Sequence, residues 1–348
     1  MKIALIRDDG IGDLIVSSPI IENIRNFKPL SKIYIYCSNR NEEYCQILKK
    51  NKIINDYFLI PKNLNLIQKI FLIIKIRKHQ YDHIFVLSPK NINYLYSKFS
   101  GAITSGIVNV NTSKNGIDRY RPAKLLINYL LNFNEIIDCR KNFSNSKDVH
   151  YSDHYISLLK KTFPTIKSPT ISYFVPKIKS SIHTTLNKNN IFDYIIFHLD
   201  EKWNRTNWKC RELNELLNAI ENNTSKNIIL TEGMIKTHFN EYINIFKFNK
   251  INDSILYKSE NFKTLFLIKD INSNDLFSLI SKSKLVIQKH GGLVHMASSF
   301  NIPVIDIIYP GTENFLKKWQ PKSDKYIQIT NNNYYDTSEK IIKFLKDY

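Results

Sequence analysis

The chain has 348 residues, of which 43% are hydrophobic and 23% charged, and this predicts about two domains with ordinary apolar cores. A formal net charge of +19 indicates an anionic partner, such as nucleic acid, an anionic membrane surface or a phosphorylated substrate. The basic residues are dispersed and form no run of five or more, so we expect no nucleic-acid partner.

The four cysteines form no CxxC pair, which argues against zinc and redox motifs and favours reduced thiols. The apolar run at the N-terminus is too short for a signal peptide. The most apolar later stretch, 67–76, contains Lys69 and Lys75 and is too short to span a bilayer. We therefore expect a cytoplasmic protein that could also contact a membrane surface.

Short β-rich runs alternate with helical patterns along the first half of the chain. Expected strands are 2–7, 32–37, 56–60, 83–88 and 101–108, and expected helices lie near 19–28, 41–50, 63–78 and 120–132. The stretch from about 140 to 190 is polar and holds three prolines and one helix, 153–163. We place the connection between domains near 177–190.

The alternation restarts after that connection. Expected strands are 193–199, 226–231, 264–269, 284–289 and 303–309, and expected helices are 210–222, 235–247, 272–283, 293–300 and 337–348. The pattern predicts two similar α/β domains, each a parallel sheet with helices on both faces, with a cleft between them. The predicted boundaries are 1–180 and 181–335, with a C-terminal helix, 336–348, that could pack back on the first domain.

The segment RDDGIGDLIVSSP, 7–19, follows the first strand and resembles a phosphate-binding loop. The dinucleotide fingerprint fails here, because Ile15 stands at the third glycine position and no acidic residue ends the second strand. Gly10 and Gly12 would then form a tight turn. Asp13 could cap the helix or carry chemistry, while Asp8 and Asp9 are expected to be structural.

Two segments carry a resemblance to a known family. IALIRDDGIGDLIVSSPIIENIRNFKP has the spacing of Gly12, Asp13 and Pro19 found at the start of glycosyltransferase family 9, the bacterial heptosyltransferases. LVIQKHGGLVHMASSFNIPVIDIIYPGTE resembles a second segment of that family near the other end. The matching residues there are Gly292, His295, Met296, Ala297, Pro303, Gly311 and Thr312.

The resemblance implies a GT-B fold, in which two Rossmann-like, doubly wound parallel-sheet domains face a cleft. The first domain would bind the acceptor and the second the nucleotide-sugar. It also implies an inverting, metal-independent enzyme with no cofactor beyond its nucleotide-sugar substrate. The sequence agrees with this in having no Asp-x-Asp triplet. An inverting transfer needs a base, and Asp13 suits that role because it follows a first strand, where α/β sheets place ligands.

Such a transfer also needs dipolar or positive groups for the leaving diphosphate. The turn His290-Gly291-Gly292 and the following helix start, with His295, could supply free N–H groups. Gly311 and Thr312 offer a further contact. The family usually has Asp-Thr-Gly at this turn, so His290 replaces a carboxylate and puts its sugar contact in doubt.

The segment FHLDEKWNRTNWKCREL, 197–213, follows the first strand of the second domain. The family has a phosphate-binding Lys before a Trp here, and we favour Lys202, with Arg205 second. Asp200 and Glu201 could pair with these cations or contact the sugar. Glu232-Gly233, after the next strand, is a candidate for contacts with adenine or ribose.

Three functions remain open from the sequence. The first is transfer of a sugar, with heptose from ADP-heptose expected, onto a lipopolysaccharide-core, capsule or other surface-glycan acceptor. The second is a different GT-B enzyme, either a UDP- or GDP-sugar transferase or an epimerase. The third is a non-enzymatic protein that binds polyanions, for which no aromatic-basic stacking motif is evident.

Overall fold

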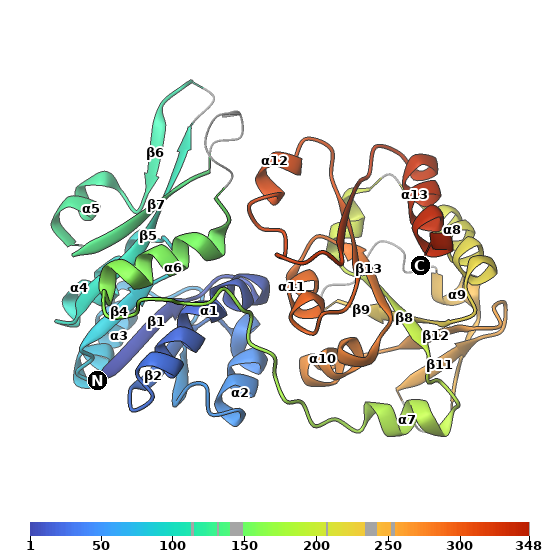
Figure 1. Ribbon diagram of the computed structural model, residues 1–348, viewed down its shortest axis with the longest axis horizontal. Coiled ribbons are helices and arrows are strands. Elements are labelled where there is room, and N and C mark those ends of the chain that lie inside the picture. The colour runs from blue at the N-terminus through green and yellow to red at the C-terminus, as the bar shows by residue number, and fades with distance from the viewer. Residues whose placement is uncertain are drawn as a thin grey trace. The chain divides into compact units, whose positions relative to one another are not determined.

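The computed structural model describes the whole chain except residues 113–114, 131, 140–148, 207, 234–241, 252–254 and 348. It divides into two compact units (Figure 1). The first unit is Met1–Lys177 together with Asn314–Trp319, and the second is Ile178–Glu313 together with Gln320–Tyr348. Each unit is built on one predominantly parallel sheet with helices packed on it.

The sheet of the first unit has the order β3-β2-β1-β4-β5-β6, with β7 also paired to β5. All pairs are parallel except β5 with β6. The central strands are apolar runs buried on both faces, as a parallel sheet covered by helices requires. The strands are β1 (Lys2–Arg7), β2 (Lys32–Cys37), β3 (Asp56–Leu59), β4 (His83–Val86), β5 (Ile103–Thr112), β6 (Asp118–Arg121) and β7 (Phe133–Asp138).

Three elements of this unit were not predicted from the sequence, namely the helix α4 and the strands β6 and β7. The helical elements are α1 (Ile11–Phe27), a 3-10 turn (Asn39–Asn41), α2 (Glu42–Lys50), α3 (Leu66–Lys78), α4 (Asn91–Phe99), α5 (Lys124–Leu130) and α6 (Tyr151–Thr162). The prediction of a first helix near 19–28 was wrong in its start, because α1 begins at Ile11 and holds Pro19 inside. Pro19 is buried, and its packing outweighs the backbone hydrogen bond that a proline removes.

The sheet of the second unit has the order β10-β11-β12-β9-β8-β13-β14-β15, antiparallel only from β10 to β12. Its strands are β8 (Tyr194–Leu199), β9 (Asn227–Glu232), β10 (Phe248–Lys250), β11 (Leu256–Ser259), β12 (Leu265–Ile268), β13 (Leu285–Lys289), β14 (Val304–Ile308) and β15 (Tyr326–Thr330). Its helices are α7 (Ile182–Lys188), a 3-10 turn (Glu201–Arg205), α8 (Cys210–Asn223), α9 (Tyr242–Phe246), α10 (Ser273–Lys282), α11 (Gly292–Ser299) and α13 (Tyr334–Asp347). The predicted helix 235–247 lies partly outside the described residues, which contain only α9.

The C-terminal helix does not follow the expectation that it packs back on the first domain. α13 packs against α8, and its Ile341 and Leu345 belong to the hydrophobic core of the second unit. An amphipathic helix buries its apolar stripe on the nearest exposed core, and here that core is the second unit's own.

A short segment near the end of the chain also departs from the predicted boundaries. Asn314–Trp319, which follows the start of α12 (Glu313–Leu316), clusters with the first unit. The Trp319 ring stacks on Tyr151 with 3.5 Å between ring centroids. The Tyr151 N–H donates to the Lys318 carbonyl over 3.0 Å, and Lys318 Nζ donates to the Asp138 carbonyl over 3.0 Å. The first unit therefore includes a segment, Asn314–Trp319, that lies beyond the predicted boundary at residue 180.

Among the described residues, no helix is both long enough and apolar enough to cross a membrane.

Candidate active site

The candidate site of the first unit lies at the carboxyl edge of its sheet, where β1 and its neighbour β4 both end. Ligands of open α/β sheets bind at this edge. Arg7, the last residue of β1, is 2% exposed and donates a hydrogen bond to the Leu87 carbonyl just past β4. Burial alone would lower the pKa of the Arg7 guanidinium, but Tyr155 and the nearby carboxylates raise it, so Arg7 stays charged.

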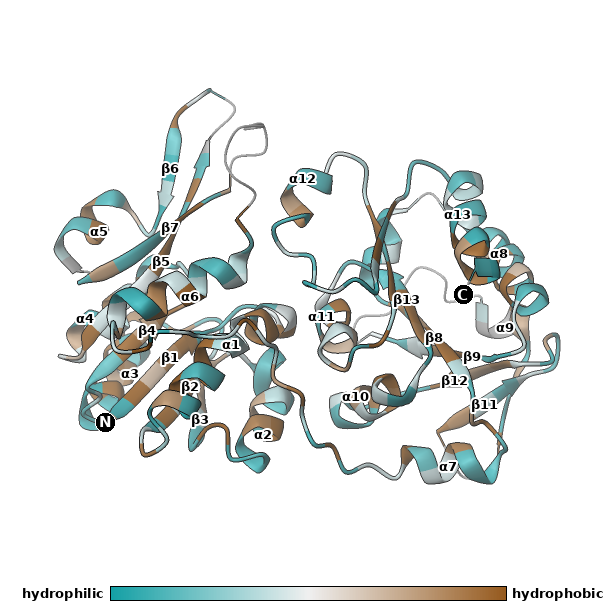
Figure 2. Cartoon of the chain, viewed as in Figure 1, coloured by the Kyte–Doolittle hydropathy of each residue, from teal (hydrophilic) through white to brown (hydrophobic). Residues whose placement is uncertain are grey.

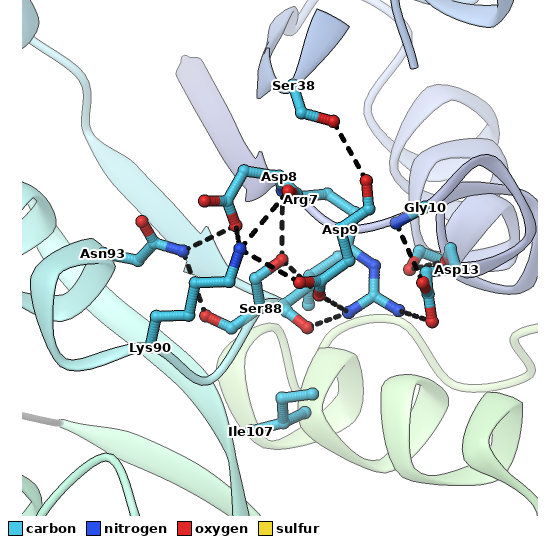
Figure 3. A network of polar contacts seen from close by, with 12 residues as sticks. Arg7, Asp8, Asp9, Gly10, Asp13, Ser38, Ser88, Lys90, Asn93 and Ile107 are labelled. Carbon is cyan, nitrogen blue, oxygen red and sulfur yellow. Dashed lines mark hydrogen bonds and ion pairs between the residues drawn. The ribbon is translucent and has the colours of Figure 1, made fainter. Parts of the chain in front are cut away.

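Asp13 lies in the first turn of α1 and faces both its own helix and Arg7 (Figure 3). Its Oδ2 accepts a hydrogen bond from the Gly10 N–H over 3.0 Å, and its Oδ1 lies 3.2 Å from an Arg7 nitrogen. The side chain is still 32% exposed. The sequence left capping and chemistry as alternatives, and this carboxylate combines a capping bond with access to solvent. Gly12 is the second residue of α1 and contributes no side chain.

Asp8 and Asp9 are held in a polar network around Ser88 and Lys90 (Figure 3). Lys90 Nζ lies 2.9 Å from Asp8 and 3.1 Å from Asp9, and the Ser88 hydroxyl donates to Asp9 over 2.7 Å. Burial would raise the pKa of Asp9, but Arg7, Ser88 and Lys90 hold it below its ordinary value. Both carboxylates thus serve the structure of the edge, as the sequence analysis expected.

The second unit gathers its polar residues where four neighbouring parallel strands end. β9, β8, β13 and β14 lie side by side, so the residues after each strand meet at one edge of the sheet. The segments concerned begin at Gly233, Asp200, His290 and Tyr309. Every predicted donor-binding residue of the second domain lies in one of these segments, in the last residue of β9 or in α11.

Lys202 lies against the glycine turn that opens α11. A Cβ atom built on Gly291 would collide with Lys202 Nζ, so the absence of a side chain at Gly291 is what admits the ammonium group. Asp200 holds Lys202 in place, because one of its oxygens accepts from the Lys202 N–H and the other lies 3.0 Å from Nζ. Lys202 is thus fixed beside a helix N-terminus, and both groups favour an anion. Arg205 is exposed.

His290 forms a buried polar pair that the sequence did not predict. Its Nδ1 lies 2.5 Å from Asp306, a fully buried residue of β14, and the Tyr326 hydroxyl donates to the same carboxylate oxygen over 2.5 Å. The His290 side chain is 19% exposed. The contact with the buried Asp306 therefore fixes the orientation of the His290 ring. His295 is buried in α11, with its ring centroid 6.1 Å from that of His290.

Lys289 is a second cation at this edge, beneath the glycine turn. It is fully buried, and its Nζ has no hydrogen-bond partner among the described residues. The ammonium instead lies over two aromatic rings, 4.4 Å from the Tyr309 centroid and 5.5 Å from that of Trp203. Burial lowers the pKa of Lys289 to about 8, against the opposing effects of Asp306 and Asp200.

The remaining predicted residues have defined local roles. Glu232 ends β9 and accepts a hydrogen bond of 2.6 Å from the Tyr242 hydroxyl. Gly311 has φ +76°, a conformation that disfavours any other residue, and the Thr312 hydroxyl closes the same turn by donating to the Tyr309 carbonyl. Glu201 is half-buried at the start of the 3-10 turn, and Gly292 is the first residue of α11.

Sequence reasoning missed three charged residues that shape the two edges. Arg7, Lys289 and Asp306 each lie in a strand whose other residues are almost all apolar and buried. A charge inside a buried strand is costly unless it is paired or functional. That cost was the signal that could have identified all three.

Two α/β units, each with its polar residues gathered at the carboxyl edge of a parallel sheet, define a protein of the GT-B class. No protein-family model matches the sequence. The lipopolysaccharide heptosyltransferase 1 of Campylobacter coli is 22% identical and matches all of this chain and 96% of its own length.

The solved structures that resemble this chain in fold include further heptosyltransferases. The ADP-heptose lipopolysaccharide heptosyltransferase II of E. coli superposes with a TM-score of 0.70 at 17% identity, over 100% of this chain and 98% of its own. The E. coli heptosyltransferase WaaC with ADP-2-deoxy-2-fluoro heptose gives 0.67 at 13% identity, over 100% and 99%. The resemblance to glycosyltransferase family 9 and the GT-B fold are thereby confirmed. A putative UDP-N-acetylglucosamine 2-epimerase of Listeria monocytogenes shares the fold at 0.60 and 12% identity, over 100% and 89%.

Proposed function

We propose that this protein is an inverting glycosyltransferase that moves heptose from ADP-heptose onto a lipopolysaccharide-core, capsule or other surface-glycan acceptor. The full-length heptosyltransferase relative supports the reaction class, and the similar fold that holds an ADP-heptose analogue supports the donor. The observation that carries the proposal is Asp13, a partly exposed carboxylate at the end of β1 that is fixed by Gly10 and Arg7.

In this reaction Asp13 takes the proton of the acceptor hydroxyl. The acceptor oxygen then forms a bond to the anomeric carbon of the donor sugar, and the bond from that carbon to the diphosphate breaks with its electrons leaving on the phosphate oxygen. A positioned general base contributes about 10²- to 10⁴-fold to such a step. Arg7 and the Gly10 N–H fix the orientation of the carboxylate without covering it.

The leaving diphosphate gains negative charge, and the second unit offers positive groups for it. Lys202 and the first N–H groups of α11 lie together at the glycine turn, where an anion can meet both. We propose that these groups do the work that a divalent metal does in other transferases. Turnover that survives a chelator would support this, and a loss restored by Mg²⁺ or Mn²⁺ would contradict it.

We place the reaction at the cytoplasmic face of the inner membrane. Acceptors of this kind are anionic and tethered to the membrane, and a chain with a net charge of +19 is attracted to an anionic surface. The proposal therefore includes peripheral contact between this protein and the membrane.

A donor screen tests the proposal directly. ADP-heptose, UDP-sugars and GDP-sugars are added singly, and the shift in unfolding temperature is measured, because a ligand of the native state stabilises it by mass action. We expect the largest shift with ADP-heptose, and mass spectrometry should detect slow release of ADP. A preference for a UDP- or GDP-sugar would contradict the proposed donor.

One observation favours a second candidate. His290 occupies the place at which the family has a carboxylate, and it is paired with Asp306. A changed sugar contact is compatible with another nucleotide-sugar, or with epimerisation of one. An epimerase would convert a UDP-sugar in the absence of any acceptor, and the same mass-spectrometric assay with chromatography of the sugar distinguishes the two.

A further inference from the structure

The helix α3 exposes an apolar face that the fold of the first unit does not use. Leu66, Ile67, Ile70, Phe71 and Ile74 are between 44% and 73% exposed. At 3.6 residues per turn these five side chains fall on one side of the helix, within an arc of about 140°. We call this set the outer face of α3.

The opposite side of the same helix already provides its packing. Ile76 is fully buried, and Leu72 and Ile73 pack against the core cluster that includes Tyr81 and Ile84. Apolar residues all round a helix are typical of one that is buried on every side, yet the exposed fractions show that only one side of α3 is covered. Figure 2 colours the chain by hydropathy, and α3 is found there by its label. The outer face therefore contributes little to the packing of the unit. Exposed apolar patches of this kind mark interaction surfaces.

The charged residues within α3 and in the segments on either side of it are all basic. No Asp or Glu occurs from residue 57 to 81, a stretch that holds five basic residues, Lys62, Lys69, Lys75, Arg77 and Lys78. Arg77 and Lys78 are exposed and fall on the same side of the helix as the apolar residues, at its C-terminal end. An apolar stripe flanked by Lys and Arg is the pattern of a helix that lies in a membrane interface.

We propose that the outer face of α3 docks this protein on an anionic lipid bilayer. The helix lies in the plane of the surface, with Ile67, Ile70 and Phe71 among the acyl chains and Arg77 and Lys78 at the headgroups. A second copy of this chain fits the face less well, because two such faces would bring positive charges together in a molecule of net charge +19. The inference deepens the proposed membrane contact and rests on it, but it needs neither donor nor acceptor.

Co-sedimentation with vesicles tests the proposal. We expect the full chain to sediment with phosphatidylglycerol vesicles and to be released by salt, and to bind phosphatidylcholine vesicles weakly. Ile67→Ser with Phe71→Ser should lower the affinity at least tenfold. Phe192→Ser is the matched control, because Phe192 of the second unit is 64% exposed, close to the 65% of Phe71. Arg77→Gln with Lys78→Gln should weaken binding to anionic vesicles only.

A substitution that keeps the apolar character guards against loss of folding. Phe71→Trp should give fluorescence that shifts to the blue with vesicles and is quenched by brominated lipid, whereas Phe192→Trp should give neither change. Equal binding by the Ile67→Ser, Phe71→Ser protein and the parent chain would overturn the proposal. So would a dimer in analytical ultracentrifugation that this double variant abolishes, since a second copy would then occupy the face. Transferase activity is not measured, so failure of the proposed reaction leaves these outcomes unchanged.

Discussion

In the first unit, the carboxyl edge of the sheet carries three carboxylates arranged around cations, whereas in the second unit it carries cations arranged around a glycine turn. Asp13 is the carboxylate left most accessible in the first case, at 32% exposure. Lys202, at 31% exposure, is the accessible cation that lies against the glycine turn in the second. Each unit also buries a second charged side chain next to its accessible group. In the first unit this charge is opposite to that of the accessible group, and in the second unit it is the same.

The buried partner of Asp13 is Arg7, an opposite charge that fixes the carboxylate. The buried neighbour of the Lys202 site is Lys289, a like charge that adds positive potential beneath the turn. In the proposed reaction the first edge would thus hold a proton acceptor in one orientation, while the second would present positive charge to an anion. Both buried charges are positive, so the two edges differ in the sign of the accessible group beside the buried charge, a carboxylate in the first unit and an ammonium in the second.

Of the substitutions considered, removal of the accessible carboxylate should change the measured activity most. Asp13→Asn is expected to lower the rate of transfer by about 10²- to 10⁴-fold, because the base is lost while the size of the side chain is kept. Donor affinity, measured by calorimetry, should not change. Asp9→Asn is the matched control, since Asp9 also pairs with Arg7 and is 28% exposed. Equal losses in both variants would contradict the role of Asp13 as the base.

Removing the accessible cation should affect donor binding. Lys202→Ala is expected to weaken ADP binding by about 10- to 100-fold, since a hydrogen bond to a charged group contributes about 1.5–3 kcal/mol. Arg205→Ala should change the affinity far less, because Arg205 is exposed at the far end of the same turn. The reverse order of the two variants, in calorimetry with ADP, would transfer the role to Arg205.

The buried like charge predicts a dependence of stability on pH. The pKa of Lys289 is about 8 in the folded protein against 10.5 for an ordinary lysine. Below pH 8 both states are protonated and folding carries the full cost of the buried charge. Between pH 8 and 10.5 the unfolded chain binds a proton that the folded chain has lost, so Lys289 destabilises less as pH rises.

Lys289→Met should therefore be more stable than the parent at pH 7, by about 1–2 kcal/mol after the loss of the contacts with Tyr309 and Trp203. The difference should shrink towards pH 10. Urea unfolding of both proteins across this range measures it. A difference that is constant with pH would show that the pKa of Lys289 is the same in the folded and unfolded states.

The glycine turn should show the smallest effect. In Gly291→Ala the new methyl group displaces Lys202 Nζ, and we expect ADP affinity to fall by a few-fold. The same substitution made in Lys202→Ala should cost nothing further, because the displaced group is already gone. Additive losses in this double-mutant cycle would mean that Gly291 acts through its own backbone instead.

The strands of both sheets could largely be predicted because they are short apolar runs; 2–7 and 32–37 coincide with β1 and β2. β6, β7, β10, β11 and β15 could not, since these strands mix polar with apolar residues and are stabilised by pairing with a neighbouring strand. The positions of Asp13, Lys202 and the turn at Gly291 beyond the ends of strands could be predicted, while their roles in the reaction stay predictions. The pairing of His290 with Asp306 could not, because it depends on the register of β13 against β14.

The recruitment of Asn314–Trp319 by the first unit has a consequence for the synthesis of the chain. When a ribosome has released residues 1–177, the partner of the Tyr151 ring and the carbonyl that accepts its N–H have not yet been made. The first unit is then complete in its sheet but incomplete in its packing, and it reaches its final form only after most of the second unit has emerged. A gene truncated after residue 177 would encode a fragment that lacks these contacts. The boundary between the two domains along the sequence is therefore not a point at which the first unit can be expressed with all of its packing contacts.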